Sequence, residues 1–430
     1  MADNELKNFI KDAREINPHI DSEFIYNAKR YFRDPSNKNR ARLEPEFKRV
    51  MNIRSQKSII KAKLFNSLYA ICDMYKSEKK SPYMYCLDLP PIMYNLESQI
   101  KAYSEAVEFN KNYNKSIEDI LFAKIIPSMI SNMSHLPTII GNIHIIALGC
   151  GSGIHEYEFV QELIKQAEVP EDKIRLYLTD INQSMVDEAL AYAGNKNLLR
   201  IKEGKKQINT MGFQLDFLRN INNRNNNPLN DLIKDDIVKI FLFFGSTLGN
   251  FHNEDQKRIF QNISNALFPM DFISLSKFIV GAKGMLYKDG KPDKERMEQE
   301  YKLTENFAFK PFEILGIGRE CLGDYEAFFN FNKYSRDNVV LEDNVPEIRC
   351  FFPVIKKTEI ECDGQKIELP VGAKISTIRS QRFTKESLEN LCSNLKKNQM
   401  GGTLRVQEIL EEQGCIAGLY ENMYLGNQGK

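Results

Sequence analysis

The sequence lacks the features that mark membrane, secreted and zinc-binding proteins. No apolar run reaches the roughly 18 residues of a membrane-spanning helix. The N-terminal residues are charged throughout and contain no apolar stretch of the kind found in signal peptides. The 8 cysteines include no C-x-x-C pair, and the 5 histidines stand apart from one another, so no zinc-ligand spacing is present. We therefore expect a cytoplasmic protein with reduced thiols and no metal site.

An excess of charge of one sign is also missing. Lys and Arg number 59 and Asp and Glu number 58, which gives a formal net charge of +1 over 430 residues. This balance argues against a uniformly basic nucleic-acid coat and against an acidic, solvating chain. One stretch departs from it, because 12 of the residues from Lys29 to Lys63 are basic and 3 are acidic. Such a stretch is either a solvated helical face or a patch for a polyanion such as nucleic acid.

What the sequence does contain is an alternation of strand and helix patterns. Short apolar runs predict strands at residues 143–148, 176–180, 213–217, 237–244 and 272–280. Helical spacing of apolar residues predicts helices between them, at residues 154–164, 185–193 and 254–267. A helix before the first strand is expected to end or kink at Pro127. Strands that alternate with helices are typical of a parallel sheet covered on both faces, so the predicted fold class is α/β.

The domain organisation follows from where this alternation starts and stops. The length corresponds to two or three domains of roughly 150 residues. We expect a helical N-terminal region at residues 1–100, a nucleotide-binding core at 101–280, an inserted α+β domain at 281–376 and the end of the core at 377–430. Inside the insert, Asp363-Gly364 predicts a β-hairpin between residues 358–362 and 365–369, because both turn positions need positive φ. The last segment predicts a helix and a final strand pair, at residues 385–395, 404–410 and 415–425.

A glycine-rich turn follows the first predicted strand directly. Gly149, Gly151 and Gly153 stand between that strand and a helix, so a ligand can approach backbone N–H groups that no Cβ shields. Asp180 ends the next predicted strand, where a carboxylate can accept hydrogen bonds from both hydroxyls of a ribose. Alternatively, Asp180 caps the helix that begins after it. Strand, turn and helix together predict the opening of a nucleotide-binding unit.

The spacing of the glycines distinguishes between nucleotides. The dinucleotide fingerprint G-x-G-x-x-G needs its third glycine where Ile154 stands, and Gly153 comes one residue too early. This spacing disfavours NAD and is that of the S-adenosylmethionine (SAM) turn, so the chain resembles class I methyltransferases. The resemblance implies SAM as cofactor and a seven-stranded, Rossmann-like sheet whose last two strands form an antiparallel pair. One position departs from that class, which has an acid where this chain has Ala147.

A second motif ends the most apolar predicted strand. The segment from Phe243 to Phe251 reads F-F-G-S-T-L-G-N-F, and ligands of open α/β sheets gather at the carboxyl ends of strands. Its glycines allow close approach and its polar residues offer contacts: Gly245, Ser246, Thr247, Gly249 and Asn250. Alternatively, the segment is a tight turn in which Asn250 or Asn253 caps the next helix. The segment resembles the G-S-T-I-G-N signature of the histidine-specific methyltransferases of ergothioneine biosynthesis, which N-methylate free amino acids.

This resemblance implies a cofactor site on named residues. They are Gly149, Gly151, Gly153, His155, Asp180, Asp216 and Phe217. Asp216 and Phe217 match the Asp-Phe step that holds adenine in the family. His155 stands where the family has a lysine near the cofactor, and without the resemblance it is an ordinary solvated helix residue.

The resemblance also implies an acceptor site. Its residues are Gly245, Asn250, Tyr301 and Ser380, of which Asn250 and Tyr301 are the expected catalytic residues. Ser380 belongs to the segment T-I-R-S-Q-R-F at residues 377–383, which is similar to the family's T-E-V-S-x-K-F. Ile378 replaces the glutamate of that segment, and a hydrophobe cannot pair with a ring N–H of imidazole. Without the resemblance, Tyr301 is a surface or interface aromatic on a polar helix.

These observations predict a SAM-dependent methyltransferase that N-methylates an amino acid or a related small molecule. Arg379 and Arg382 are candidates for binding the carboxylate of such an acceptor. Alternatively, Arg382, which stands where the family has a lysine, is an ordinary surface charge. Two alternative functions stay open. In one, the chain methylates a protein or RNA that binds the basic N-terminal region. In the other, it is a non-catalytic binding module that keeps the methyltransferase fold.

Overall fold

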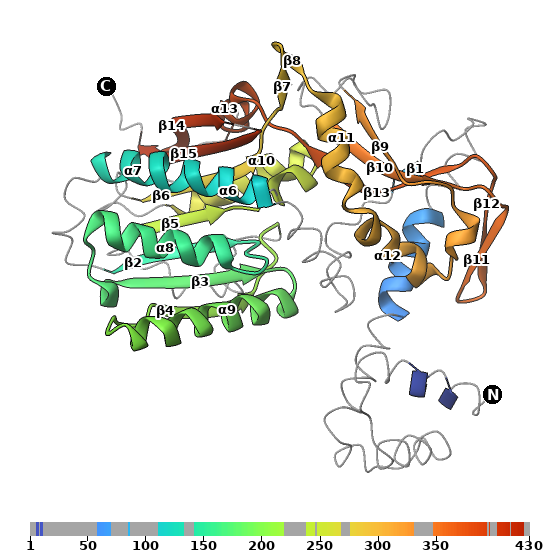
Figure 1. Cartoon of the computed structure of the whole chain (residues 1–430), viewed down its shortest axis with the longest axis horizontal. Helices are drawn as coiled ribbons and strands as arrows, with labels where there is room; N and C mark the ends of the chain where they lie inside the picture. Colours follow the sequence, from blue (N-terminus) through green and yellow to red (C-terminus); the bar gives the residue numbers. More distant parts are fainter. Residues whose placement is uncertain are drawn as a thin grey trace.

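The computed structural model describes most of the chain from residue 111 onward and short parts before it. The described residues are 6–7, 9–11, 58–69, 85–86, 111–132, 142–218, 238–245, 247–267, 276–330, 347–393, 395, 402–412 and 414–424. Figure 1 shows a large helix-covered sheet beside a second, smaller body that is formed by the insert. Within the described segments, no helix has both the length and the apolar character that crossing a membrane requires.

The large sheet has seven strands. Read from one edge, their order is β4 (Asn209–Gln214), β3 (Ile174–Asp180), β2 (Ile143–Leu148), β5 (Val238–Phe243), β6 (Lys277–Lys283), β15 (Cys415–Tyr424) and β14 (Gly402–Glu412). The first five strands of this order are parallel, and the last two run antiparallel to their neighbours. Both central strands, β2 and β5, are buried at every position, as their apolar sequences predict. This topology confirms the expected α/β sheet and its terminal antiparallel pair.

Helices cover both faces of this sheet. One face packs against α6 (Lys111–Ile120), η2 (Leu121–Ile125), α7 (Ile126–Asn132), α8 (Ile154–Ala167) and α9 (Gln183–Lys202). The other face packs against α10 (Asn253–Ala266) and α13 (Lys385–Ser393). Pro127 does not end its helix, because helical backbone continues through α7. Instead the segment before it is a π-helix, which changes the hydrogen-bond register at the residue that has no N–H to donate.

Two strands, β4 and β6, lie several residues away from their expected positions. The third strand, expected at residues 213–217, is β4 at Asn209–Gln214, an edge strand whose partly exposed residues give no apolar run. Asp216 and Phe217 therefore follow the strand at its carboxyl end. The fifth strand, expected at 272–280, is β6 at Lys277–Lys283, and residues 272–275 lie outside the described part.

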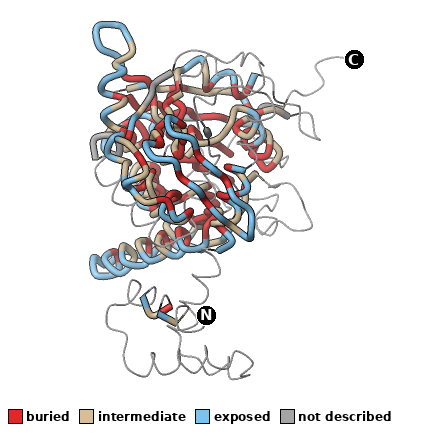
Figure 2. The backbone as a smooth tube through the Cα atoms, turned by 90° about the vertical axis from the view of Figure 1, so that its right-hand side faces the viewer, coloured by how far each residue is buried: buried red, intermediate tan, exposed pale blue. Residues whose placement is uncertain are grey.

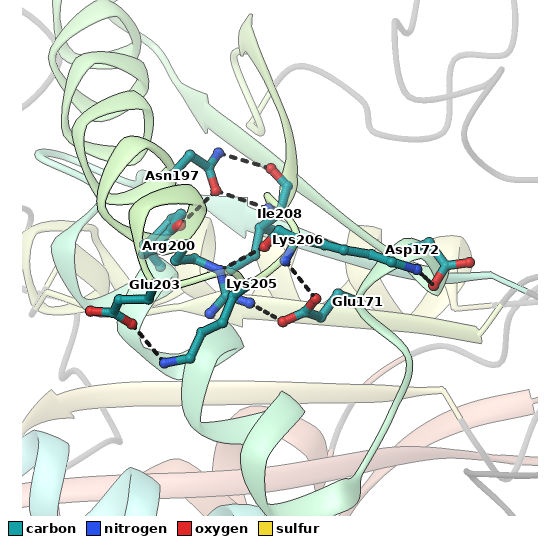
Figure 3. A network of polar contacts seen from close by, with 9 residues as sticks. Glu171, Asp172, Asn197, Arg200, Glu203, Lys205, Lys206 and Ile208 are labelled. Carbon is teal, nitrogen blue, oxygen red and sulfur yellow. Dashed lines mark hydrogen bonds and ion pairs between the residues drawn. The ribbon is translucent and has the colours of Figure 1, made fainter.

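A polar network fixes the chain between α9 and β4 (Figure 3). The Arg200 guanidinium donates to the Lys206 carbonyl over 3.0 Å and pairs with Glu171 of η4 (Glu171–Lys173). The Asn197 side chain accepts from the backbone N–H of Ile208 over 2.8 Å and donates to its carbonyl over 3.0 Å. Because the Arg200 side chain is nearly buried, the network holds the start of the edge strand against the helix.

The insert has its own sheet and core. Its four strands are ordered β1 (Tyr85–Cys86), β13 (Lys374–Gln381), β10 (Glu347–Pro353) and β9 (Glu326–Asn330). The remaining elements are β7 (Tyr287–Lys288), β8 (Lys291–Pro292), α11 (Lys294–Lys302), α12 (Glu305–Leu315), η7 (Arg319–Cys321), β11 (Thr358–Cys362) and β12 (Gln365–Leu369). The β11–β12 hairpin has the predicted bounds, with positive φ at both Asp363 and Gly364. Figure 2 shows buried backbone gathered in the interior, with exposed backbone on the helices and hairpins around it.

The N-terminal region contributes directly to the insert, which its polar sequence did not indicate. The helix at residues 58–69 buries Ile60, Leu64, Phe65 and Leu68 in the insert's core. Strand β1 adds to the insert sheet beside β13. Of the basic stretch from Lys29 to Lys63, only residues 58–63 lie among the described ones. β13 continues to Gln381 within the insert sheet, so the chain returns to the core after that residue.

Candidate functional site

The glycine turn after β2 lies against the acid at the end of β3. The backbone N–H of Gly151 donates to one carboxylate oxygen of Asp180 over 3.3 Å. The other oxygen accepts from the N–H of Asn182 over 3.0 Å. The N-cap of α9 is Asn182, whose side chain accepts from Ser184, so Asp180 does not cap that helix. Burial raises the pKa of Asp180 although these backbone hydrogen bonds oppose it.

The glycines of the turn are required by its backbone and its neighbours. Gly149, Gly151 and Gly153 all have positive φ, between 53° and 71°. A Cβ on Gly153 would lie 2.7 Å from the Cβ of Ala189 on α9, so α8 and α9 could not approach as they do. A Cβ on Gly149 would lie 3.3 Å from the Thr247 side chain and 3.7 Å from the Phe217 ring. The turn therefore borders both the residues expected to bind adenine and the second motif.

Asp216 and Phe217 directly follow Leu215, which is bonded to the end of β3. The N–H of Leu215 donates to the Asp180 carbonyl over 2.7 Å, which joins the carboxyl ends of β3 and β4. Phe217 is buried, with ring centroids 5.6 Å from Phe243 and 5.8 Å from Phe251. The Asp216 carboxylate is half-buried and accepts from the N–H of Leu218 over 3.1 Å.

His155 and Glu156 begin the helix after the glycine turn. His155 Nδ1 lies 3.1 Å from a carboxylate oxygen of Glu118 on α6, so its ring is directed toward that helix. Burial lowers the pKa of His155, but the hydrogen bond to Glu118 and the charge of Glu156 outweigh it and raise the pKa overall. Glu156 is buried, and burial together with the charge of Asp180 raises its pKa to about 7, against the opposing charge of His155. Sequence reasoning missed this buried carboxyl, because Glu in a first helical turn is commonplace.

The second motif forms a turn at the carboxyl end of β5. Gly245 has a φ of 75°, and η6 (Thr247–Asn250) follows; Ser246 lies outside the described residues. The turn is held by the Gln256 side chain, which donates to the carbonyls of Leu248 and Phe251 over 3.0 and 2.9 Å. The N-cap of α10 is His252, so neither Asn250 nor Asn253 caps that helix.

The end of β13 packs on this turn, so the segment 377–383 lies against the second motif. η6 contacts both β6 and β13. A Cβ on Gly249 would lie 2.7 Å from the Gln381 carbonyl oxygen, so the close approach needs glycine. The Gln381 side chain donates to Asn253 over 2.8 Å and pairs with Gln256. Sequence reasoning missed Gln381, because its partners are more than a hundred residues away in the chain.

The predicted acceptor residues Tyr301 and Ser380 contact each other. The Tyr301 hydroxyl of α11 donates to the Ser380 hydroxyl of β13 over 2.7 Å. Both residues are buried, so the interpretation of Tyr301 as a surface aromatic is wrong. Lys283 Nζ lies 4.5 Å and the Arg382 guanidinium carbon 5.5 Å from the centroid of the Tyr301 ring. Ile378 packs against the insert's core.

Neither arginine of the 377–383 segment is an ordinary surface charge. Arg382 is fully buried; it donates to the Gly284 carbonyl over 3.1 Å and pairs with Glu300. Arg379 pairs with Glu347, whose carboxylate also pairs with Arg349. Arg379 faces Arg349 across the β10–β13 pair, and it points to the sheet face opposite Ser380.

The arrangement suits an adenosyl cofactor. A glycine turn, a buried acid and an Asp-Phe step gather at the carboxyl ends of three adjacent strands, which is where ligands bind in open α/β sheets. No three His, Cys, Asp or Glu side chains within the described segments gather to hold a metal ion.

Comparison with known proteins gives the family. Residues 89–400, more than half of the chain, match the family described as "Histidine-specific methyltransferase, SAM-dependent". No curated protein sequence matches the chain.

Similar solved structures include three methyltransferases. The sugar N-methyltransferase KedS8 from Streptoalloteichus sp has a TM-score of 0.32 and 7% identity, with coverage of 70% of this chain and 87% of its own. The amino pentose methyltransferase CalS10 from Micromonospora echinaspora has a TM-score of 0.32 and 9% identity, with coverage of 74% and 96%. The glycopeptide N-methyltransferase MtfA has a TM-score of 0.29 and 5% identity, with coverage of 68% and 85%. Because these similarities are distant, the assignment depends on the family match, which covers the glycine turn, η6 and the Tyr301–Ser380 pair: the chain belongs to the histidine-specific, SAM-dependent methyltransferases.

Proposed function

We propose that the protein transfers a methyl group from SAM to the amine of a small, amino-acid-like acceptor that binds where η6 meets β13. One observation carries the proposal. The η6 turn borders the glycine turn through Thr247 on one side and β13 through Gly249 on the other. The residues predicted from sequence for the cofactor and for the acceptor are therefore neighbours across a single turn.

The cofactor half of the proposed site consists of the glycine turn, two acids and an aromatic ring. We assign the backbone of Gly149, Gly151 and Gly153 to close contact with the cofactor, and the Asp180 carboxylate to its ribose hydroxyls. Asp216 and Phe217 hold the adenine, by a hydrogen bond and by ring contact. SAM supplies an electrophilic methyl group on a sulfonium when it is bound.

The acceptor half of the site aligns the amine with the methyl group and excludes water from it. We assign Asn250 and the backbone at Gly245 to the amino-acid end of the acceptor, and Tyr301 with Ser380 to the wall of its pocket. An amine must lose its proton before it can attack, since an ammonium has no lone pair. Alignment of the two reactants alone can lower the activation free energy by up to about 7–11 kcal/mol.

The cofactor assignment is tested by calorimetry with S-adenosylhomocysteine. Asp180→Asn removes the charge from the ribose hydrogen bonds, so the affinity should fall by about tenfold or more. Asp187→Asn changes an exposed carboxylate on α9 and is the matched control, with no expected effect. Equal affinities of the Asp180 and Asp187 variants would refute the assignment.

The acceptor assignment is tested by product formation with a panel of amino acids. Asn250→Ala should lower the turnover of an accepted amino acid by about tenfold or more, because a buried polar group of the acceptor loses its partner. Its affinity for S-adenosylhomocysteine should stay within about twofold of the unaltered protein. Equal loss of both would show that Asn250 supports the fold and does not bind the acceptor. Cofactor binding without turnover of any amine would favour the non-catalytic alternative.

A further inference from the structure

Glu156 is a buried carboxyl at the start of the helix that follows the glycine turn. It is 3% exposed and lies in the first turn of α8, whose N-cap is Gly153. Burial raises the pKa of Cys150, inside the turn, and the charges of Asp180 and Glu156 raise it further. Asp180 also acts on Glu156 itself. The carboxyl of Glu156 therefore lies close to the turn that we assign to the cofactor, where the proposed function gives it no role.

Within the part of the chain that the structure describes, neither Glu156 nor Asp180 pairs with a lysine or an arginine. Asp180 accepts from backbone N–H groups, and the largest charge that opposes Glu156 is that of His155. The Nδ1 atom of His155 is directed toward α6, 3.1 Å from a carboxylate oxygen of Glu118. One imidazole is thus shared between the carboxyls of Glu118 and Glu156.

Two lysines on elements that pack against α8 are engaged elsewhere. Lys196 of α9 pairs with Glu158, and Lys124 of η2 pairs with Glu412 of β14. A carboxylate that is buried without a cation costs stability, and burial raises the pKa of Glu156 to about 7. Proteins retain such a destabilising group most often where it serves binding or catalysis.

We propose that Glu156 supplies the counter-charge for the α-ammonium group in the methionine part of SAM. The inference rests on the proposed function, because it takes the glycine turn as the cofactor site. SAM carries positive charge on its sulfonium and on this ammonium. The sulfonium must face the acceptor at η6, which borders the turn at Gly149. Glu156 follows the other end of the turn, so the ammonium is the cation that it can stabilise, and a buried charge acts strongly over several ångströms.

This role couples cofactor binding to the release of a proton. In the free protein Glu156 keeps its proton up to a pH of about 7. A cation bound near it favours the ionised form and lowers its pKa, so binding below pH 7 releases the proton. The affinity should therefore rise with pH until the free protein has lost the proton as well. At pH 6, about one pKa unit below that point, binding should be about tenfold weaker than at pH 8.

The test follows proton release while S-adenosylhomocysteine, which keeps the ammonium, binds to the protein. Calorimetry at pH 6, in buffers of different ionisation enthalpy, should show nearly one proton more released by the unaltered protein than by Glu156→Gln. At pH 8 the affinity of Glu156→Gln should be about tenfold lower, and at pH 6 this difference should nearly vanish. Comparing the two proteins at the same pH cancels the titration of the ligand. Glu168→Gln, an exposed carboxyl at the end of the same helix, is the matched control and should behave like the unaltered protein.

A second ligand separates an electrostatic role from a structural one. The analogue of S-adenosylhomocysteine in which hydrogen replaces the α-amino group should bind the unaltered protein and Glu156→Gln equally well. An equal loss of affinity for both ligands would show that Glu156 only supports the turn. Equal proton release by the unaltered protein and Glu156→Gln would also overturn the proposal, as would a release that only His155→Gln abolishes. In these cases the cofactor still binds and the proposed function survives. If S-adenosylhomocysteine does not bind the unaltered protein at any pH, the proposed function fails and the role of Glu156 fails with it.

Discussion

Replacing Glu156 by Gln should stabilise the protein in a pH-dependent way. Glu156 is buried in the first turn of α8; burial is the largest influence on its pKa and raises it, whereas the charge of His155, the next largest, lowers it. Gln has nearly the same shape and keeps an oxygen for hydrogen bonding, but it carries no charge at any pH. The variant therefore isolates the cost of ionising this carboxyl inside the protein.

The gain in stability and the pH range in which it develops follow from the pKa of Glu156 in the unfolded and in the folded protein. The pKa rises from an ordinary 4.5 to about 7 in the folded protein. Below the lower value both states bind the proton, and the substitution changes nothing. As the pH rises between the two values, the unfolded chain releases the proton and the folded protein keeps it, so the protein with Glu156 loses stability. Above the upper value the full cost is reached, about 3 kcal/mol at roughly 1.4 kcal/mol for each pKa unit.

The assay is thermal unfolding at pH 5 and pH 8. At about 2 cal/mol/K of unfolding entropy per residue, the gain at pH 8 corresponds to a rise in Tm of about 3 °C. At pH 5 the rise should be about 1 °C or less, since most of the cost has not yet developed. Glu168→Gln changes an exposed residue at the end of the same helix and should leave the Tm nearly unchanged at both pH values.

Two results would refute this account of Glu156. A gain of equal size at pH 5 and pH 8 would mean that the substitution changes packing rather than ionisation. A loss of stability at pH 8 would mean that the ionised carboxylate makes favourable contacts in the folded protein. His155→Gln in the same background checks that the neighbouring imidazole, which also titrates, is not the source of the pH dependence.

Three further substitutions test the fold around the site by thermal unfolding. Gly153→Ala places a Cβ at positive φ and 2.7 Å from the Cβ of Ala189, so we expect a loss of about 1–2 kcal/mol from the backbone alone and weaker binding of S-adenosylhomocysteine. Arg200→Met leaves Glu171 without its guanidinium partner and should cost about 1–3 kcal/mol with the cofactor affinity unchanged. Tyr301→Phe removes a buried hydrogen bond and should cost about 1 kcal/mol, and an unchanged Tm would show that the bond contributes nothing.

The sheet and its ligand edge could be predicted because their signals are local. The apolar run of β2 and the glycine turn after it are contiguous in the sequence, and β2 has the expected bounds of Ile143–Leu148. The β11–β12 hairpin was predictable for the same reason, since Asp363-Gly364 sets its turn. Strand β4 was misplaced, because an edge strand with partly exposed residues does not show an apolar run.

Contacts between distant segments could not be predicted. Nothing in the sequence near Gly249 indicates that the Gln381 carbonyl lies against it, because that contact depends on how the insert returns to the core. The contact of Lys283 with the Tyr301 ring could not be predicted either, since a lysine at the end of a strand is usually solvated. The contribution of residues 58–69 to the insert's core was also missed, because four apolar residues on a polar helix do not show what they pack against.

The two departures from the family pattern have different consequences in three dimensions. Ala147 stands where the class has an acid, and Glu156, which follows the glycine turn, is a buried carboxyl within electrostatic reach of Asp180. Because burial raises the pKa of Glu156 to about 7, this carboxyl keeps its proton below that pH and does not restore a fixed negative charge beside the turn. Ile378, in the segment that we propose to line the acceptor site, stands where the family has a glutamate and packs against the insert's core. We therefore expect the protein to bind S-adenosylhomocysteine as its family implies and to bind histidine weakly, because Ile378 cannot pair with a ring N–H of imidazole. Calorimetry with a panel of amino acids in the presence of S-adenosylhomocysteine checks this, and histidine as the tightest ligand would contradict it.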